Sequence, residues 1–257
     1  MKVNNIYFGY DKTNNIFNDL SLEIPKGKIT TIIGPNGCGK STLLGLLTKG
    51  YKTKQGEITL DGININQIRK KHFARKVAVL HQQNNEKLNI TVRELVAYGR
   101  TPHQKVYEGL TKEAEEIIDW ALTCTKLTEL QERSLDALSG GQRQRAWLAM
   151  ALCQKPEILF LDEPTTYLDM YYQIDLLDLV KKLNSQHQMT IVMVLHDVNQ
   201  ALNYSHHIIV MKSGQVIKTG SPAQIANSQL IGEVYKINGK FHQEDGKRHI
   251  KHAYYIY

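Results

Sequence analysis

Cysteine is scarce in this sequence of 257 residues, and long apolar runs do not occur in it. The three cysteines, Cys38, Cys124 and Cys153, form no C-x-x-C pair and no cysteine–histidine spacing of the kind that zinc sites use. A disulfide scaffold and a structural zinc site are therefore excluded as the basis of the fold, and a reducing compartment is indicated.

Signals for secretion or membrane insertion are also missing. The opening stretch MKVNNIYFGY lacks the apolar region of a signal peptide. The longest apolar runs, such as IVMVL at 191–195, are far shorter than the roughly 20 residues that span a bilayer. Repeats, low-complexity segments and flexible linkers are absent as well. We therefore expect a soluble chain, for which any role at a membrane requires partner subunits.

The positive charge of the chain is not concentrated in one place. The formal net charge is +7 at pH 7, and 42% of the residues are hydrophobic, enough for a large core. A basic chain suits nucleic acid, acidic headgroups or phosphate ligands equally well. The short basic runs RKKH at 69–72 and KRHIKH at 247–252 are typical of solvated faces. Composition alone therefore selects no partner.

Five histidines raise the question of a metal site. They are His206, His207, His242, His249 and His252. Two are adjacent and the others are loosely spaced, which is unlike the spacing of metal ligands, so we expect no metal site there.

Short apolar runs alternate with helical patterns, which predicts an α/β fold with a mainly parallel sheet. The expected core strands are residues 29–34, 76–82, 157–164 and 190–197. Alternation before residue 29 and at 56–65 predicts antiparallel strands beside this sheet. Residues 86–155 are predicted to be mostly helical. After Pro222 we expect a helix and then a small hairpin with turns at 238–239 and 245–246.

The stretch GPNGCGKST at 34–42 fits the phosphate-binding pattern G-x-x-x-x-G-K-[ST], between a predicted strand and a predicted helix. Its glycines let backbone N–H groups surround a β-phosphate, Lys40 neutralises the β- and γ-phosphates, and Ser41 can ligate Mg²⁺. Cys38 is interpreted as a small residue that fits the loop, with a modifiable thiol as the alternative. The expected nucleotide contacts are Gly34, Pro35, Asn36, Gly37, Cys38, Gly39, Lys40, Ser41 and Thr42.

Two carboxylates follow another apolar run, in ILFLDEPTTYLD at 158–169. Asp162 and Glu163 would lie at the carboxyl end of a strand, where open α/β sheets bind ligands. We expect Asp162 to hold Mg²⁺ through water and Glu163 to act as the general base for an attacking water. The alternative is that the two acids cap a helix together with Pro164.

Three further residues are candidates for the same nucleotide site. Gln82, after VAVLH, could contact Mg²⁺ and the attacking water, and His196, after IVMVL, could donate a hydrogen bond to the γ-phosphate. Tyr10 could stack on an adenine ring. Each also has a plain structural alternative, because glutamine or histidine at a strand end and tyrosine at a surface are common.

A second potential phosphate site lies in LSGGQRQRAWLAMAL at 138–152, where apolar residues recur at helical spacing. Ser139 is a good N-cap, and the bare Gly140 and Gly141 leave backbone N–H groups uncovered, so this helix end could bind an anion. An ordinary helix cap is the alternative.

Together these motifs resemble the ATP-binding subunits of ABC (ATP-binding cassette) transporters over nearly the whole chain. The phosphate loop, Gln82, LSGGQ, LFLDEP, the LD pair at 168–169 and His196 occur in the order typical of that family. The resemblance implies an α/β P-loop NTPase core with an N-terminal antiparallel β-subdomain and an inserted helical subdomain. Within a single domain it assigns residues 1–85 and 156–220 to the β-subdomain and core, 86–155 to the helical subdomain, and 221–257 to a C-terminal helix and hairpin.

Members of this family act as head-to-tail pairs, which would explain two phosphate sites in one chain. The resemblance implies that Ser139, Gly140, Gly141 and Gln142 of one subunit bind the γ-phosphate of ATP held by the phosphate loop of the other. Asp169 is assigned to the nucleotide site on the same ground. ATP and Mg²⁺ are the implied cofactors, and ATP hydrolysis is the implied reaction.

The segments around these motifs resemble the importer branch for iron–siderophore, haem and cobalamin complexes, and its iron–siderophore members most. The implied partners are a second ATP-binding subunit, two integral membrane permease subunits and, indirectly, an extracytoplasmic substrate-binding protein, with no nucleic acid. The implied location is the cytoplasmic face of the membrane. In that branch the segment after Gln82 touches the membrane subunits, so Tyr98 and Arg100 are candidate contacts, with a helix packed on the core as the alternative. His81 departs from the residue, often proline, that many relatives have there.

Other functions stay open at this point. A haem or cobalamin importer is one, and a soluble ABC-type ATPase acting on nucleic acid is another. The long coiled coils or second cassette of nucleic-acid-linked members are not evident in the sequence. A non-hydrolysing regulatory subunit is disfavoured because Lys40, Glu163 and His196 are all present.

Overall fold

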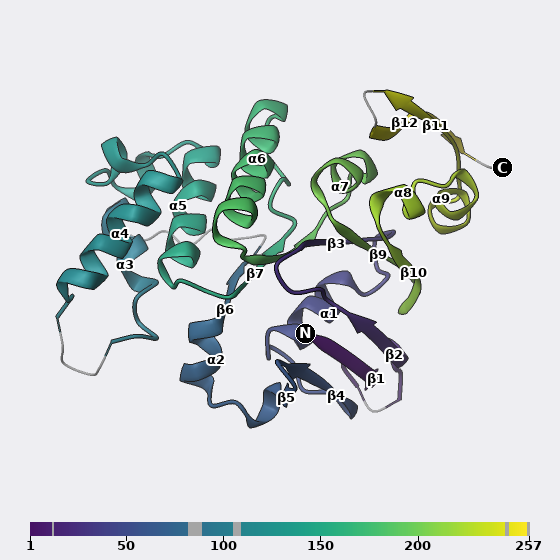
Figure 1. Cartoon of the computed structure of the whole chain (residues 1–257), viewed down its shortest axis with the longest axis horizontal. Coiled ribbons are helices and arrows are strands. Elements are labelled where there is room, and N and C mark those ends of the chain that lie inside the picture. The colour runs from purple at the N-terminus through teal and green to yellow at the C-terminus, as the bar shows by residue number, and fades with distance from the viewer. Residues whose placement is uncertain (12, 82–88, 105–108, 245–246, 256–257) are drawn as a thin grey trace. The chain divides into compact units, whose positions relative to one another are not determined.

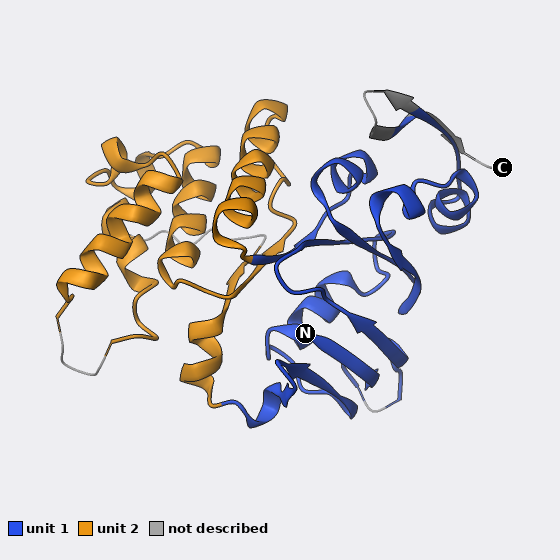
Figure 2. Cartoon of the chain, viewed as in Figure 1, with its two compact units in different colours: residues 1–68, 190–257 blue, residues 69–189 orange. Residues whose placement is uncertain are grey.

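The computed structural model describes residues 1–257 apart from residues 12, 82–88, 105–108, 245–246 and 256–257 (Figure 1). Two compact units make up the chain (Figure 2). Unit 1 combines both ends of the chain, residues 1–68 and 190–257, whereas unit 2 is the continuous segment 69–189. Within the described ranges, no helix is both long and apolar enough to cross a bilayer.

Unit 1 begins with an antiparallel sheet, as the alternating pattern predicts. Its strands are β1 (Lys2–Phe8), β2 (Phe17–Glu23), β4 (Gln55–Leu60) and β5 (Ile63–Asn64), in the order β2-β1-β4-β5. In β2 the buried positions are Phe17, Leu20 and Leu22, with exposed polar residues between them. One face of this sheet is therefore apolar and the other is polar, as in most antiparallel sheets that are covered on one side.

The second sheet of unit 1 is built around β3 (Ile29–Ile33), whose five residues are all buried. Parallel to β3 on its two sides run β8 (Thr190–Val194) and β9 (His207–Lys212), and β10 (Gln215–Gly220) pairs antiparallel with β9. Strands buried on both faces are continuous apolar runs, which is why the runs at 29–34 and 190–197 are recognisable in the sequence. Their parallel pairing confirms the predicted fold class. The helical elements here are α1 (Lys40–Leu47), η1 (Ile65–Gln67) and α7 (Val198–Tyr204).

The C-terminal part of unit 1 contains two helices and a hairpin. The helix expected after Pro222 is divided into α8 (Pro222–Ile225) and α9 (Ser228–Tyr235), because the Asn227 side chain caps α9 by accepting from the N–H of Leu230. The hairpin consists of β11 (Ile237–Glu244) and β12 (Lys247–Tyr255). The predicted turn at 238–239 is wrong, since both residues pair with β12 inside β11. The other predicted turn, at 245–246, lies outside the described residues.

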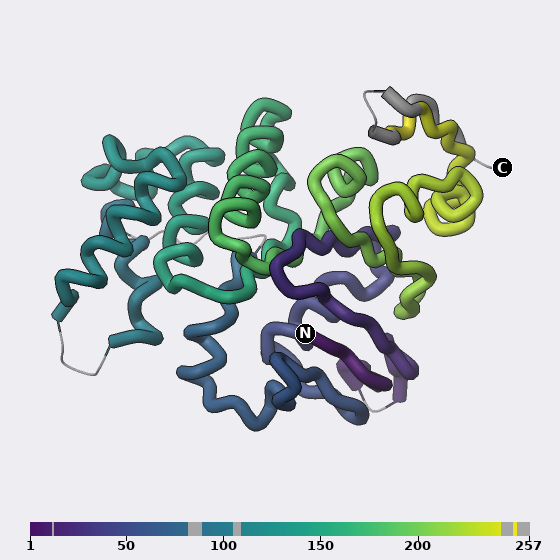
Figure 3. Tube along the Cα trace, in the orientation of Figure 1, coloured from purple at the N-terminus to yellow at the C-terminus, as the bar shows by residue number. Residues whose placement is uncertain are grey.

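Unit 2 contains two parallel strands and, within the described residues, more helical elements than unit 1; Figure 3 traces the path of the chain through it. The strands are β6 (Val77–Leu80) and β7 (Ile158–Asp162). The helical elements are α2 (Lys70–Lys76), α3 (Val92–Tyr98), α4 (Lys112–Cys124), η2 (Thr128–Leu130), η3 (Leu135–Ala137), α5 (Gly140–Cys153) and α6 (Met170–His187). Helices α3, α4 and α5 fall within the predicted helical segment 86–155. The compact unit is wider than that segment because it also includes α2, both strands and α6.

An arginine joins the first two of these helices. Arg93 of α3 donates to Glu115 and Asp119 of α4 at 2.5 and 2.7 Å, and to the side chain of Gln131 at 2.7 Å. Thr91 and Thr111 cap the N-termini of α3 and α4 through their side-chain oxygens. The orientation of this helical layer therefore depends on polar contacts as well as on its apolar core.

Two turns of unit 1 offer a matched test of backbone constraint. Ser213-Gly214 and Asp61-Gly62 both have positive φ at both positions, as two-residue type I′ hairpin turns require. A Cβ atom on Gly214 would lie 1.9 Å from the Ile16 carbonyl oxygen, whereas one on Gly62 would meet nothing within 4 Å.

We expect Gly62→Ala to lower the free energy of unfolding by about 1 kcal/mol, from backbone strain alone. Gly214→Ala is expected to lower it by about 2–4 kcal/mol, because steric overlap adds to the same strain. Urea denaturation of both variants checks this, and equal losses would contradict the role given to the Ile16 carbonyl.

Candidate nucleotide-binding site

The phosphate loop, residues 34–39, joins β3 to α1 in unit 1. Lys40 is only 5% exposed, and its ammonium donates to the carbonyl oxygens of Gly34 at 2.9 Å and Pro35 at 3.2 Å. A Cβ atom on Gly34 would lie 2.2 Å from the carbonyl oxygen of Met211, so glycine is required by close packing as well as by the motif. The lysine charge is thus held at the loop backbone, where the β- and γ-phosphates of a nucleotide would bind.

The first turn of α1 presents the next two motif residues in different ways. Ser41 is exposed, whereas Thr42 is buried and its Oγ1 lies 2.9 Å from the hydroxyl of Tyr10. Tyr10 is 63% exposed, and its ring meets Phe8 and Tyr51 edge-on, with centroids 5.4 Å away in each case. The structure therefore places Tyr10 beside the phosphate-loop helix with much of its ring open to solvent.

Parallel pairing brings His196 to the same edge of the sheet as the phosphate loop. Ile32 of β3 is in register with Val194 of β8, so both strands end at this edge. His196 follows β8 and is exposed, and Asp197 caps α7 by accepting from the N–H of Gln200 at 3.0 Å. Unit 1 thus brings together three of the predicted elements: the phosphate loop, Tyr10 and His196.

In unit 2 the predicted carboxylates lie at the carboxyl end of β7. Asp162 ends the strand and Glu163 follows it, and both are partly buried. Glu163 has a φ of 49°, an unusual value for a residue with a side chain, and its Oε2 accepts from the Thr166 hydroxyl at 3.3 Å. Backbone conformations of this kind are often found at functional sites. No helix starts at Pro164 in the described chain, so the alternative of a helix cap is not observed.

Two other predicted residues of this unit have different outcomes. Gln82 lies outside the described residues, two positions after the end of β6. Asp169 is the N-cap residue of α6 and is exposed. Its assignment to the nucleotide site stays a prediction.

Ser139 and Gln142 form a capping box at the start of α5. The Ser139 hydroxyl accepts from the Gln142 N–H at 3.3 Å, and the Gln142 side chain accepts from the Ser139 N–H at 3.0 Å. Gly140 is open, whereas Gly141 is buried and a Cβ atom there would lie 2.9 Å from the Tyr172 ring. Ser139 therefore caps α5, as the alternative interpretation of this residue predicts. Gly141 also allows close packing on α6.

The C-terminal end of α5 is also held by side chains. The Arg100 guanidinium, 6% exposed, donates to the Cys153 carbonyl at 2.9 Å, and the His103 ring lies 2.9 Å from the Gln154 carbonyl. Positive groups at the carbonyl end of a helix are favourable. Arg100 is therefore a structural residue, and its prediction as a contact for membrane subunits is corrected. Tyr98, by contrast, is 57% exposed.

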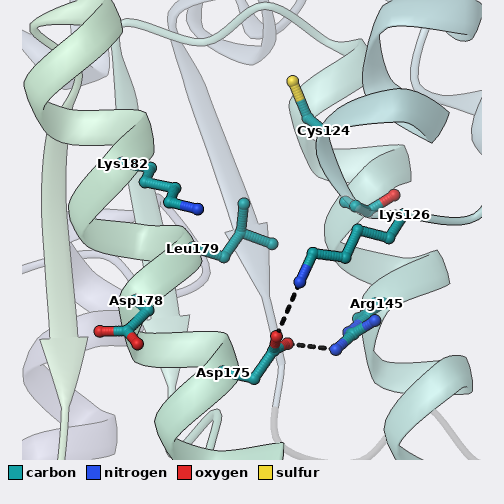
Figure 4. Close-up of a pocket in the computed structure, with 8 residues that line it drawn as sticks. Cys124, Lys126, Arg145, Asp175, Asp178, Leu179 and Lys182 are labelled. Atoms are coloured by element: carbon teal, nitrogen blue, oxygen red, sulfur yellow. Dashed lines mark hydrogen bonds and ion pairs between the residues drawn. The ribbon is translucent and has the colours of Figure 1, made fainter.

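An ion cluster joins α5 to α6 in a pocket of about 180 Å³ (Figure 4). The Asp175 carboxylate of α6 accepts from Arg145 of α5 and, at 3.0 Å, from Lys126 just after α4. Burial opposes ionisation of Asp175, but the two cations outweigh it and hold the pKa of this carboxyl below its usual range. The helix that carries Ser139 is thus fixed at both ends and along its side.

Asp175 and the capping role of Arg100 are not predictable from the sequence. Asp175 pairs with residues 30 and 49 positions away, and Arg100 with a carbonyl 53 positions away. Nothing in the local sequence identifies such partners. For Arg145 alone the sequence indicates an acidic partner in general terms, because arginines on amphipathic helices commonly pair with acids.

Cys38 and His206 behave as structural residues. Cys38 is buried, and burial raises the pKa of its thiol, which disfavours the reactive thiolate. His206 accepts the N–H of Ile29 at 3.1 Å through Nδ1. Among the residues that the structure describes, no three potential ligands gather closely enough to hold a metal ion.

Comparison with known proteins is consistent with this site. A family model for ABC transporters matches residues 17–166. The chain is 46% identical to the iron(3+)-hydroxamate import ATP-binding protein FhuC of Bacillus subtilis, over 88% of this chain and 84% of that protein. It is also 46% identical to the ferric enterobactin transport ATP-binding protein FepC of Escherichia coli, over 88% of this chain and 83% of that protein. A dimeric, post-hydrolysis structure of the ATP-binding cassette MJ0796 with ADP and Pi has a TM-score of 0.72 and 29% identity, covering 86% of this chain and 98% of that one.

The ion cluster around Asp175 should stabilise the protein in a pH-dependent way. We expect Asp175→Asn to lower the free energy of unfolding at pH 7 by about 1–3 kcal/mol, because the carboxylate accepts charged hydrogen bonds in a largely buried site. Since the folded pKa is lowered, this contribution is complete above the unfolded value of about 3.9 and is lost as the pH falls through the folded value.

Urea denaturation of both proteins from pH 7 to pH 3 measures this, and the difference between them should shrink at the acidic end. The control Lys126→Met removes the more exposed cation and should cost at most about 1 kcal/mol. A difference between wild type and Asp175→Asn that is independent of pH would refute the electrostatic explanation.

Proposed function

Since the chain belongs to the family of ABC transporter ATP-binding proteins, and is therefore an ATP-hydrolysing cassette, we propose that it energises import of a ferric siderophore through a membrane ABC transporter. The observation that carries this proposal is 46% identity over 88% of the chain to two import or transport proteins named for ferric chelates. The two relatives are equally similar but handle different chelates, so the proposal names the class of substrate and not one siderophore. Haem and cobalamin importers are the neighbouring alternatives.

The nucleotide contacts in unit 1 fit ATP. Lys40 supplies a buried positive charge at the loop, and exposed Asn36, Gly37 and Ser41 leave the outer side of the loop open to a ligand. Curled backbone N–H groups and a lysine are the groups that bind the β- and γ-phosphates in P-loop proteins. In this proposal the Tyr10 ring stacks on adenine, and the Thr42 hydroxyl holds Tyr10 in place.

The oxygen ligands fit Mg²⁺, which prefers hydroxyl and carboxylate oxygens. Ser41 presents an exposed hydroxyl at the start of α1, and Asp162 presents a carboxylate at the end of β7. With Gln82, these residues would hold the ion. When bound, Mg²⁺ would neutralise charge on the β- and γ-phosphates.

Hydrolysis requires a base and a donor to the γ-phosphate. Glu163 is the proposed base, because its carboxylate is partly buried, fixed by Thr166 and placed after the strand that carries Asp162. His196 would donate a hydrogen bond to the γ-phosphate from the edge where the phosphate loop begins. Lys40 and Gln82 complete the proposed catalytic set.

A second copy of the chain would complete the site through α5. The start of α5 combines the positive end of a helix dipole with the Ser139 hydroxyl, the Gln142 amide and open glycine backbone at Gly140, which together suit a γ-phosphate. The dimeric structure of the cassette MJ0796 supports pairing of two copies, and the head-to-tail arrangement is part of the proposal. Asp169, exposed at the N-cap of α6, is proposed to belong to the same composite site.

The proposed location is the cytoplasmic face of the membrane, against two permease subunits. An extracytoplasmic binding protein would deliver the substrate to these subunits. Exposed Tyr98 at the end of α3 is a candidate contact with these subunits. No role in binding nucleic acid is proposed, because the similar proteins compared above are transport proteins.

Removal of the proposed base should separate binding from turnover. We expect Glu163→Gln to bind ATP with near-normal affinity and to hydrolyse it at least about 100-fold more slowly. The variant should accumulate as a dimer with Mg-ATP, as measured by steady-state phosphate release and light scattering. Glu157→Gln, which removes an exposed carboxylate beside β7, serves as the control and should keep full activity. Near-normal turnover by Glu163→Gln would exclude this residue as the base.

Uptake in cells tests the substrate class. In a host strain lacking this gene, we expect loss of ⁵⁵Fe uptake from ferric siderophores, restored by the wild-type gene and not by Glu163→Gln. Uptake of haem iron and of cobalamin should be unchanged, since separate import systems would serve them. Loss of haem or cobalamin uptake with intact siderophore uptake would reassign the substrate and leave the ATPase function standing.

A further inference from the structure

Tyr235, the last residue of α9, packs against an apolar cluster that reaches the residue before the phosphate loop. This cluster includes Ile33, the residue directly before the loop, and Tyr235 packs against it together with Val198 of α7 and Phe241 of β11. The aromatic ring of a C-terminal helix thus supports the strand end from which the phosphate loop emerges.

The hydroxyl of Tyr235 is buried beside the loop itself. No described residue makes a hydrogen bond of ordinary geometry with this oxygen, although the backbone N–H of Gly34 is close enough to affect the phenol. Burial raises the pKa of the phenol most, and the nearby Cys38 and Asp197 raise it further, so the hydroxyl stays neutral. Buried hydroxyls are normally paired, and an unpaired one calls for an explanation.

The C-terminal hairpin is also fastened to the helix that follows His196. The Asn199 side chain of α7 accepts the N–H of Ile250 at 2.7 Å and donates to the Ile250 carbonyl at 3.3 Å. A single amide therefore pairs with β12 as another strand would. Phe241 of the same hairpin packs against the apolar cluster that Tyr235 also contacts, so the hairpin is held both to α7 and to this cluster.

We propose that Tyr235 is a positioning residue for the phosphate loop, and that its hydroxyl accepts the Gly34 N–H when the loop holds nucleotide phosphates. The described parts of the C-terminal segment, residues 222–244 and 247–255, would then brace the loop against α7. Preorganised backbone donors bind charge better than donors that must first be arranged. This inference requires nucleotide binding alone, so it does not depend on which substrate the transporter imports.

Tyr235→Phe is the decisive variant, because it keeps the ring and its packing and removes only the hydroxyl. We expect the Kd values for ATP and ADP to rise about three- to tenfold, the range that one lost neutral hydrogen bond produces. The KM for ATP should rise in parallel, while kcat at saturating ATP stays within about twofold of wild type. The melting temperature without nucleotide should stay close to the wild-type value, since no hydrogen bond of ordinary geometry is lost there.

Titration calorimetry and steady-state ATPase assays on the full chain supply these values. Tyr7→Ala is the control, since it removes a half-buried tyrosine ring from β1 and should leave both Kd values unchanged. Tyr235→Phe with wild-type Kd and KM overturns the proposal, whether or not its melting temperature falls. A lower melting temperature with unchanged Kd shows that the residue is structural only, and it also overturns the proposal.

Discussion

Parallel pairing around β3 is the constraint on which the nucleotide site of unit 1 depends. β3 lies between β8 and β9, and all five of its residues are buried. Ligand contacts can therefore form only where the chain leaves the ends of the strand. The phosphate loop leaves at the carboxyl end, where His196 also emerges from β8. Because loops carry uncovered N–H groups and the strands carry none to spare, the chemistry gathers at this edge.

Rigid support of the loop comes from groups that take no part in the motif. Met211 leaves no room for a side chain at Gly34, and the Gly214 N–H donates to the Cys38 carbonyl at 3.0 Å. Within the motif itself, Lys40 adds hydrogen bonds to two loop carbonyls. The proposed action of Tyr235 extends this support to the C-terminal segment, which otherwise has no evident role in the reaction.

Helix α5 shows how one element can serve both stability and a proposed ligand. The Ser139–Gln142 capping box satisfies donors at the start of the helix, and these are the groups that would turn toward a γ-phosphate in a dimer. In such a dimer the capping hydrogen bonds would be exchanged for bonds to the phosphate, while the rest of the helix would keep its place. Arg100 at its far end, and Asp175 through Arg145 on its side, provide that fixed frame.

Local patterns in the sequence were sufficient for the fold class and for the main elements. Runs of apolar residues with an occasional threonine marked β3, β6, β7 and β8 because strands buried on both faces hold few polar residues, and glycine and lysine spacing marked the phosphate loop. The N-cap at Ser139 was equally local. These features depend on neighbours within about ten positions, which a single sequence displays directly.

Only the tertiary structure decided which side chains meet across long separations. It placed Arg100 inside the protein as a cap, put Asn238 and Gly239 within a strand instead of a turn, and paired Asp175 with two distant cations. A turn dipeptide is a weak local preference, and pairing with β12 outweighs it. An ion pair between residues 30 or 49 positions apart has no local signature, because its energy depends on where the folded chain brings the charges together.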